Sequence, residues 1–225
     1  MGSTRLPGKV MKLINGTPMI SLLLNRLSKS NKIDKIVVVT TDNERDDKLY
    51  KYVKELNYLC YRGSENNVLK RYLDAAKLHN ANIIVRITGD CPLIDPLIVD
   101  TCIDKFLKLD VDYLSNTLFP TFPDGLDVEV FQYSALDTAN NEAKEKYDRE
   151  HVTPYLKFNG KFSTYNYCNR INLSRCRWTV DTEEDFCVIK NVYNHFYPNL
   201  NFGWKQVVDL ERKYPEYFTE NKNLK

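Results

Sequence analysis

The first ten residues, MGSTRLPGKV, combine side chains that suit the binding of a polyphosphate. Glycines at positions 2 and 8 would let backbone N–H groups approach an anion, and Arg5 and Lys9 would neutralise its charge. The backbone donors expected to face the phosphates are those of Gly2, Ser3 and Thr4. A frayed basic terminus is the alternative interpretation, so the phosphate loop is a hypothesis at this point.

This loop does not fit the P-loop of ATPases. A P-loop has four residues between its glycines and a Ser or Thr after its lysine, which binds magnesium. Here five residues separate Gly2 from Gly8, and Val10 follows Lys9. The spacing and the missing hydroxyl therefore exclude a P-loop.

Two aspartates follow predicted strands and are candidates for a metal site. Asp90 comes after the apolar run at 83–87, and Asp181 comes after the run at 176–180. In an open parallel sheet, ligands bind outside the carboxyl ends of the strands, so these carboxylates can meet there. Mg²⁺ takes oxygen ligands and often needs only one or two protein carboxylates. The alternative is structural: Asp90 caps a turn, and Asp181 caps a helix.

Further candidates lie along the predicted ligand edge of the sheet. Asp127 and Glu129 share one face of a predicted strand, with Asp124 shortly before it, and could accept hydrogen bonds from sugar hydroxyls or add metal contacts. Three further residues stand where another predicted strand ends, again at the ligand edge, and either face the ligand or form a plain turn: Arg62, Gly63 and Ser64.

A last set of candidates opens a predicted helix in the second half of the chain. Arg149 could pair with the carboxylate or phosphate of an acceptor, and Glu150 and His151 follow it directly. His151 is either a general base or a capping histidine. We expect this set to contact the acceptor.

Hydrophobic periodicity predicts that strands and helices alternate through the first half, which is typical of a doubly wound, mostly parallel α/β sheet. The predicted strands are 35–40, 58–61 and 83–87, and the predicted helices begin at Thr17–Pro18 and span 44–56, 67–78 and 95–107. In the second half, the pattern predicts a smaller mixed α+β extension. Its predicted strands are 113–116, 126–131, 162–167 and 176–180, and its predicted helices are 134–146, 150–158, 183–195 and 204–213. We expect a single domain over 1–225, in which 1–110 binds nucleotide and 111–225 binds the acceptor.

Composition excludes several classes of protein. A net charge of +2 gives no reason to expect a nucleic-acid or anionic-membrane binder. No apolar run approaches the ~20 residues of a membrane span, and the start lacks the apolar core of a signal peptide, so we expect a cytoplasmic protein. The six cysteines show no Cys-x-x-Cys spacing and are expected to be reduced thiols.

Five blocks in order carry a family resemblance. They are residues 1–10, 86–95 (RITGDCPLID), 123–131 (PDGLDVEVF), 149–155 (REHVTPY) and 177–182 (RWTVDT). Together they resemble nucleotidyltransferases that activate acidic sugars with CTP, specifically the group of spore coat polysaccharide biosynthesis protein F. That group is related to the 3-deoxy-manno-octulosonate and acylneuraminate cytidylyltransferases.

The resemblance implies a Rossmann-like fold of the nucleotide-diphospho-sugar transferase type and a Mg²⁺-dependent transfer of CMP from CTP to an acidic sugar, with release of pyrophosphate. It implies that Asp90 and Asp181 hold the metal, that Arg5 and Lys9 are catalytic, and that Gly89 lies at the nucleotide. It also implies that the segment with Arg62, Gly63 and Ser64 lies near the base or ribose. Surface polysaccharide synthesis is the implied pathway, and a homodimer is the implied assembly.

One departure from the family concerns the start of the chain. In that family an apolar central strand precedes the loop, whereas this sequence begins at the loop. We therefore expect two neighbouring strands with unpaired backbone groups, and an upstream segment in the fully active enzyme.

Two rival functions stay open. One is a glycosyltransferase that uses a nucleotide sugar, although such an enzyme does not explain the Arg5 to Lys9 loop. The other is a non-catalytic descendant that binds nucleotide or a partner.

Overall fold

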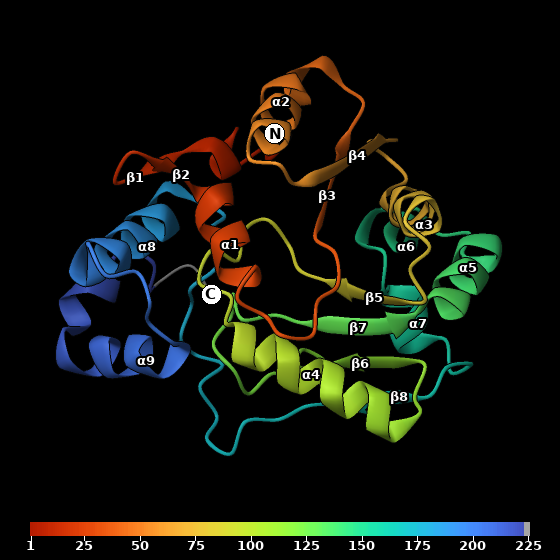
Figure 1. Ribbon diagram of the computed structural model, residues 1–225. Helices are drawn as coiled ribbons and strands as arrows, with labels where there is room; N and C mark the ends of the chain where they lie inside the picture. Colours follow the sequence, from red (N-terminus) through yellow and green to blue (C-terminus); the bar gives the residue numbers. More distant parts are fainter. Residues whose placement is uncertain (223–225) are drawn as a thin grey trace.

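A four-stranded mixed sheet lies in the middle of the fold, as the computed structural model of the chain shows (Figure 1). Residues 1–222 are described. The strands of this sheet are β5 (Ile83–Arg86), β6 (Tyr113–Ser115), β7 (Glu129–Gln132) and β8 (Thr164–Asn166), in the order β5-β7-β6-β8. β7 is antiparallel to both β5 and β6, whereas β6 and β8 are parallel.

Helices cover both faces of this sheet. They include α3 (Val68–Leu78), α4 (Pro96–Leu109) and α5 (Tyr133–Glu142). Successive residues of a strand point to opposite faces. Leu114 and Val130 accordingly join the hydrophobic cluster that contains α4, while Tyr113 and Phe131 join the cluster that contains α3 and α5. The predicted α/β class is confirmed, with a mixed pairing because β7 inserts antiparallel between β5 and β6.

A second, two-stranded parallel sheet stands beside the first. It consists of β3 (Val37–Thr41) and β4 (Leu59–Gly63), with Val37 opposite Leu59, and α2 (Asp47–Glu55) connects them after the 3-10 helix η2 (Glu44–Asp46). Within residues 1–222, β3 pairs only with β4, and β5 pairs only with β7. The two sheets are therefore not joined by hydrogen bonds between β3 and β5.

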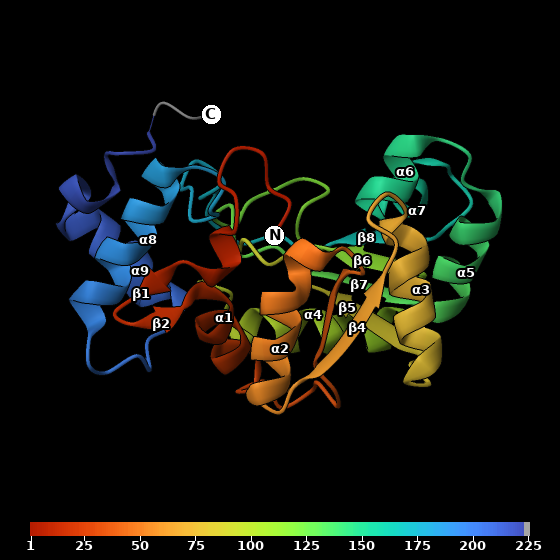
Figure 2. The same ribbon diagram turned by 90° about the horizontal axis from the view of Figure 1, so that it is seen from above.

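The remaining helices lie at the two ends of the molecule. Seen from above, α8 and α9 form one end, and α3, α5, α6 and α7 form the other (Figure 2). Their bounds are α6 (Lys146–His151), α7 (Pro154–Phe158), α8 (Glu183–Phe196), α9 (Trp204–Lys213) and the 3-10 helix η3 (Pro215–Phe218). In residues 1–222, no helix has the length and apolar character needed to cross a membrane.

The predicted helix start at Thr17–Pro18 is wrong. These residues form β2 (Thr17–Pro18), which pairs with β1 (Leu13–Ile14) in a hairpin, and α1 (Met19–Leu27) begins directly afterwards. Asn15 and Gly16 connect the strands, and both have positive φ, 50° and 78°. Asn-Gly is the sequence that favours a two-residue hairpin turn of this kind. The local turn preference therefore overrides the capping pattern.

Two other predicted elements differ from the structure. Residues 176–180 form no strand and make one isolated bridge, from Arg177 to Asp124, because the neighbouring segments are loops rather than strands. The predicted helix 150–158 is split into α6 and α7 at Val152, whose φ is 72°. A buried Val152 in this conformation interrupts the helix.

Candidate functional site

The structure brings Asp90 and Asp181 together around the ammonium group of Lys9. Lys9 Nζ lies 3.1 Å from Asp90 Oδ2 and 3.0 Å from Asp181 Oδ1, and it donates to the carbonyl oxygen of Val180 at 2.7 Å. The Lys9 side chain is only 13% exposed. A single cation therefore bridges the two carboxylates that were predicted to share one, and three distant segments of the chain converge on it.

Asp90 is held by the turn that follows β5 and by the segment before α8. The hydroxyl of Thr88 donates to Asp90 Oδ1 at 2.5 Å, and the backbone N–H of Val180 donates to the carbonyl oxygen of Asp90 at 2.9 Å. A Cβ atom on Gly89 would lie 3.3 Å from Val10 Cγ1. Gly89 thus permits the close approach of the amino-terminal loop to the turn.

Asp181 is surrounded by cations. Its Oδ2 atom lies 3.0 Å from the guanidinium of Arg5 and 3.2 Å from that of Arg177. Burial opposes ionisation of this carboxyl, but the hydrogen bond and charge of Lys9, with those of Arg5 and Arg177, lower its pKa below the usual range. Asp181 is therefore a carboxylate at neutral pH, as a metal ligand must be.

Arg177 and Asp185 organise this side of the site. Sequence analysis gave Arg177 no role and did not identify Asp185. Arg177 binds both carboxylate oxygens of Asp185 at 2.9 Å and also contacts Asp124 Oδ2 at 3.0 Å. Asp185 in turn accepts from the backbone N–H groups of Asp181 and Thr182. Thr182 and Asp185 form a capping box at the start of α8. The Thr-x-x-Asp spacing before an apolar run was the signal that could have identified Asp185.

The amino-terminal loop is compact. Ser3 accepts the backbone N–H of Leu6 at 3.2 Å, and Gly8 has φ 69°, in the left-handed region that favours glycine. Gly2, Thr4 and Arg5 are exposed, and the Arg5 side chain is 63% exposed. Arg5 can therefore contact an incoming anion while one of its nitrogen atoms contacts Asp181.

The segment that carries Asp124 and Asp127 packs directly against the segment that carries Arg177. Trp178 donates its backbone N–H to Asp124 at 2.7 Å, and a Cβ atom on Gly125 would lie 2.6 Å from the carbonyl carbon of Trp178. Gly125 also has φ 103°. Only glycine fits this close crossing, which keeps Asp124 beside Arg177.

Asp127 has a strongly perturbed carboxyl group. Burial, together with the negative charges of Asp124, Glu129 and Asp90, raises its pKa from 3.8 to about 7. Near neutral pH it is therefore present in both protonation states, and it can accept or donate a hydrogen bond.

Glu129 is buried in a separate network. It accepts from Tyr113 and Thr153 at 2.7 Å each and pairs with Lys157 at 2.8 Å and with Arg86. Burial opposes ionisation, but Arg86 and Lys157 lower the pKa of Glu129 to about 2. These contacts connect β5, β6 and β7 to α7, whereas Asp127 stays near Asp90.

Arg62, Gly63 and Ser64 lie at the end of β4. Arg62 donates to the carbonyl oxygen of Thr41 at 2.8 Å and pairs with Asp47 at 2.7 Å, while Gly63 is opposite Thr41 in the two-stranded sheet. Ser64 accepts the backbone N–H of Asn67 at 3.1 Å. These contacts join the end of β4 to β3 and to the starts of α2 and α3, and none of them involves Asp90 or Asp181.

Arg149, Glu150 and His151 lie on α6, near the end of α5. Arg149 donates to the carbonyl oxygen of Ala143 at 2.7 Å and so satisfies the carboxyl end of α5. Glu150 and His151 are exposed, and the His151 ring packs against the Tyr147 ring at an interplanar angle of 51°, with centroids 4.4 Å apart. The structure does not bring this set into contact with Asp90 or Asp181.

The donors at Asp90 and Asp181 fit a hard cation. Both supply carboxylate oxygens, and a cation already bridges them. Among residues 1–222, no group of three or more His, Cys, Asp or Glu side chains is arranged to hold a metal. A two-carboxylate site of this kind suits Mg²⁺, which commonly takes its remaining ligands from substrate phosphates and water.

Comparison with known proteins matches the chain to the cytidylyltransferase family model over residues 1–222. An uncharacterised protein of Methanocaldococcus jannaschii is 36% identical over 227 residues, which cover all of this chain and 92% of that protein. The spore coat polysaccharide biosynthesis protein SpsF of Bacillus subtilis is 30% identical over 228 residues, which cover 98% of this chain and 94% of that protein.

A solved structure is also similar along nearly the whole chain. It is that of a cytidylyltransferase from Leptospira borgpetersenii serovar Hardjo-bovis, with 38% identity and a TM-score of 0.93. The match covers 97% of this chain and 92% of the other. The family resemblance inferred from the five sequence blocks is confirmed.

Proposed function

The chain belongs to the cytidylyltransferase family, and we propose that it transfers CMP from CTP to an acidic sugar or a related acid, with release of pyrophosphate. The observation that carries this proposal is the placement of Lys9 between Asp90 and Asp181, with Arg5 beside it. A pair of carboxylates for a metal ion and two cations for phosphates occupy one site, as nucleotidyl transfer requires.

In the proposed reaction, an oxygen of the acceptor loses its proton to water and forms a bond to the α-phosphorus of CTP. The bond from that phosphorus to the oxygen that bridges the α- and β-phosphates breaks, and pyrophosphate leaves with the electron pair. Arg5 and Lys9 neutralise the charge on the leaving phosphates. Arg suits bidentate phosphate contacts, and Lys acts as a point charge. Lys9 must therefore turn from the carboxylates toward the phosphates when CTP binds.

Asp90 and Asp181 would hold Mg²⁺. When bound, the ion neutralises charge and polarises a phosphoryl oxygen. The protein's own contribution is to keep both carboxylates ionised and fixed. Arg177 and Thr88 supply that positioning, since they hold Asp181 and Asp90 respectively.

The acceptor side of the site is proposed to include Asp124 and Asp127. Asp127, with its pKa of about 7, can exchange hydrogen bonds with a sugar hydroxyl. The roles of Glu129 and the Arg149 to His151 set toward the acceptor remain predictions, as does the role of Arg62, Gly63 and Ser64 toward the base or ribose. Because Lys9 and Asp90 precede residue 111 and Asp181 follows it, both predicted halves of the chain supply the site.

Surface polysaccharide synthesis is the pathway we propose. The name of the SpsF relative places that protein in the synthesis of a spore coat polysaccharide. A cytoplasmic location and a homodimer are parts of the same proposal.

The test is pyrophosphate release from CTP and Mg²⁺ with a panel of acidic sugars. We expect release with at least one acid, and a loss of roughly 10²–10³-fold for Asp90→Asn. Asp209→Asn is the matched control, because Asp209 is exposed on α9 and should leave turnover unchanged. Near-normal turnover in Asp90→Asn would contradict the metal assignment. Release of a nucleoside diphosphate from a nucleotide sugar would instead identify a glycosyltransferase.

A further inference from the structure

Two cations and one carboxylate form a cluster on the face of the four-stranded sheet that packs against α3, α5 and α7. Arg86 is the last residue of β5, and Lys157 lies on α7. Both pair with Glu129, the first residue of β7, which is opposite Arg86 in the register of the sheet. We call Arg86, Glu129 and Lys157 the Arg86 cluster.

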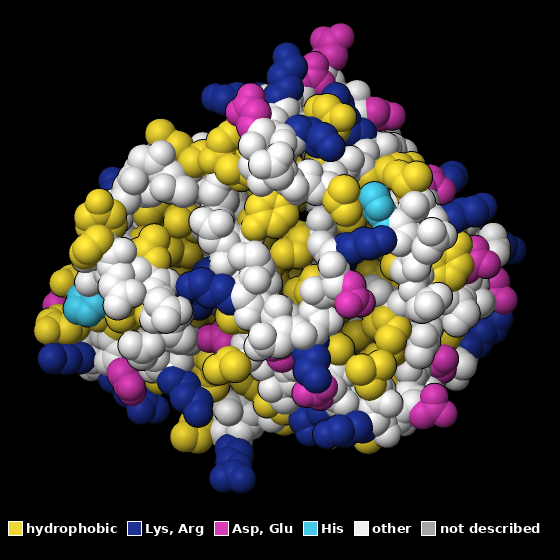
Figure 3. All heavy atoms as spheres, viewed as in Figure 1, with side chains coloured by type: hydrophobic (Ala, Val, Ile, Leu, Met, Phe, Trp, Pro, Cys, Tyr) yellow, Lys and Arg dark blue, Asp and Glu magenta, His cyan; other side chains and the backbone are white. Residues whose placement is uncertain are grey.

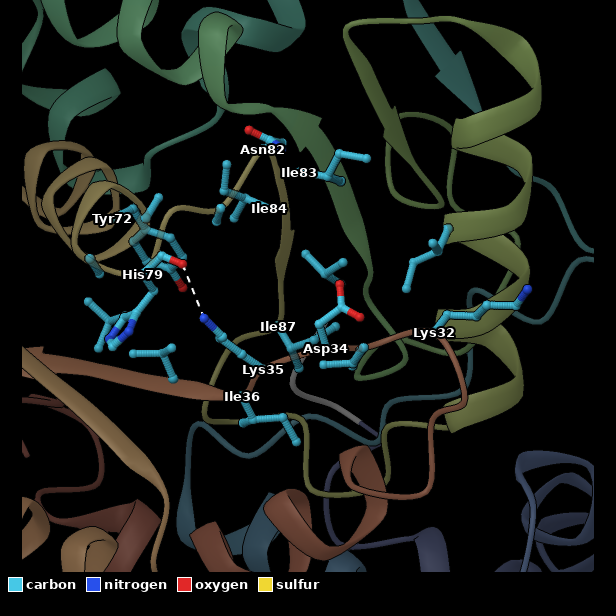
Figure 4. Close-up of a pocket in the computed structure, with 18 of the residues that line it drawn as sticks. Lys32, Asp34, Lys35, Ile36, Tyr72, His79, Asn82, Ile83, Ile84 and Ile87 are labelled. Atoms are coloured by element: carbon cyan, nitrogen blue, oxygen red, sulfur yellow. Dashed lines mark hydrogen bonds between the residues drawn. The ribbon is translucent and has the colours of Figure 1, made fainter.

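The Arg86 side chain lies on the α3 side of β5. Successive residues of a strand point to opposite faces, so Arg86 shares its face with Ile84. In the close-up, Ile84 points toward α3 and Tyr72, whereas Ile83 points to the other side of the strand (Figure 4). The guanidinium carbon of Arg86 is accordingly 5.9 Å from the centre of the Tyr72 ring. An aromatic ring therefore borders the cluster and attracts its guanidinium.

The Arg86 cluster carries one positive charge in excess. Burial opposes ionisation of Glu129, but Arg86 and Lys157 lower its pKa to about 2, so it is a carboxylate at neutral pH. Two cations thus share one anion. A charge that is largely removed from water is costly unless an opposite charge meets it. One carboxylate from a ligand would balance the cluster, whereas a phosphate dianion would leave an excess negative charge.

Both cations keep hydrogen-bond donors for a further partner. The side chains of Arg86 and Lys157 are 18% and 19% exposed, so both reach solvent. A guanidinium has five N–H donors and an ammonium group has three. Within residues 1–222, the Nε atom of Arg86 is buried and has no hydrogen-bond partner. The described part of the chain therefore does not use the full hydrogen-bonding capacity of Arg86.

The Arg86 cluster lies at the same edge of the sheet as the candidate metal site. β5 ends at Arg86, and Asp90 follows four positions later; β7 begins at Glu129, two positions after Asp127. Burial raises the pKa of Asp127, and so do the charges of Asp124, Glu129 and Asp90, which places Asp127 near both groups. An acceptor bound across Asp127 can therefore reach the metal site with one end and the Arg86 cluster with the other.

The cation that the sequence assigned to the acid group of the acceptor is engaged elsewhere. Arg149 donates to the carbonyl oxygens of Asn140 and Ala143, at the end of α5. On the face shown in the space-filling view, basic and acidic side chains are interspersed rather than gathered by sign (Figure 3). Recognition of an acid thus depends on a local pair of cations, as in the Arg86 cluster.

On the basis of the proposed cytidylyltransferase function, we propose that Arg86 and Lys157 bind the carboxylate of the acceptor and so select an acidic substrate. Arg86 offers planar, paired donors that suit a carboxylate, and Lys157 adds a point charge. Glu129 neutralises one of the two cations, and the carboxylate of the acceptor neutralises the other. The acceptor class is therefore a hydroxylated acid with one carboxylate, which lies on the α7 side of the sheet.

The test compares acids with their uncharged amides. Calorimetry, with and without CMP and Mg²⁺, measures the binding of three acids and of the corresponding amides: 3-deoxy-manno-octulosonate, galacturonate and gluconate. The wild type should bind at least one acid roughly 10–100-fold more tightly than its amide, because the charge-assisted hydrogen bonds need the carboxylate. In Lys157→Met this preference should fall by roughly tenfold or more.

Lys161→Met is the matched control, because Lys161 lies shortly after α7 and pairs with the exposed Glu142. Its preference for the acid should equal that of the wild type. An equal preference in wild type and Lys157→Met would overturn the proposal, since the carboxylate would then be bound elsewhere. Failure of the wild type to bind any of the three acids would overturn it as well.

Arg86→Lys tests the other cation without removing its charge from Glu129. The unfolding midpoint should stay close to that of the wild type, while the preference for the acid falls, because lysine lacks the planar donors. An unchanged preference would exclude Arg86 from the contact. The proposed function has its own readout, pyrophosphate release. Release with an acid whose binding ignores both variants contradicts the carboxylate contact alone, and acid binding that responds to them without any release contradicts the transferase activity alone.

Discussion

The guanidinium of Arg177 holds the carboxylate of Asp185 by two hydrogen bonds of 2.9 Å, from Nε to Oδ1 and from NH2 to Oδ2. The Asp185 side chain is fully buried. The same NH2 group also donates to Asp181, one of the two carboxylates around Lys9. This ion pair therefore connects the start of α8 to the candidate metal site. Because Asp185 holds Arg177 in place, Arg177 positions the carboxylate of Asp181.

Replacing Arg177 by Met should destabilise the protein by about 3–5 kcal/mol, because Asp185 would remain as a buried carboxylate without its cation. Urea unfolding followed by circular dichroism measures the loss. Arg170→Met is the control, since Arg170 is exposed. Equal unfolding midpoints for the two variants would refute the structural role of the Arg177–Asp185 pair.

Replacing Lys9 by Met should separate metal binding from turnover. Without nucleotide, the Lys9 ammonium occupies the space between Asp90 and Asp181, so its removal should tighten the binding of Mg²⁺ alone, measured by calorimetry. Pyrophosphate release should nonetheless fall by roughly 10²–10³-fold, because a phosphate cation is lost. Lys12→Met is the matched control, since Lys12 pairs with Glu183 instead. A Lys9→Met variant with unchanged Mg²⁺ affinity and turnover would exclude both roles.

Replacing Asp127 by Asn should remove a specific part of the pH dependence of stability. The folded-state pKa of Asp127 is raised from 3.8 to about 7 by burial and by the carboxylates of Asp124, Glu129 and Asp90. The folded state thus binds this proton more tightly than the unfolded state. Its stabilising contribution is complete below about pH 4 and is lost as the pH rises through about 7.

Unfolding free energies of wild type and Asp127→Asn, measured in chelator from pH 4 to 8, check this sign. The wild type should lose stability relative to the variant across that interval and then remain level. Parallel curves for the two proteins would show that the environment of Asp127 does not perturb its carboxyl group.

The convergence of Asp90 and Asp181 could be predicted from sequence, although the predicted strand before Asp181 does not form. Asp90 does follow a strand, and the rule for ligand binding at strand ends applies to it. Asp181 follows an irregular segment, and its position is fixed instead by the bond from Val180 N–H to the Asp90 carbonyl and by Arg177. Tertiary hydrogen bonds of this kind leave no periodicity in the sequence.

Other parts of the fold carried signals that competed with one another. Thr17–Pro18 resembles a helix start, but the adjacent Asn15–Gly16 turn determines the local structure. The antiparallel insertion of β7 between β5 and β6 could not be read from a short apolar strand, because strand direction depends on distant connections. The network around Glu129 was likewise hidden, since Lys157 comes from a helix 28 positions further along the chain.

The most direct test of the account is a thermal-shift comparison of CTP, UTP, GTP and ATP, each with Mg²⁺ and with chelator. A nucleotide at 100 times its dissociation constant adds about 2.7 kcal/mol of stability, which shifts the midpoint by several degrees. We predict that CTP stabilises selectively and that chelator abolishes the effect. Equal shifts with all four nucleotides, or no shift with any of them, would contradict a cytidylyltransferase site at Lys9, Asp90 and Asp181.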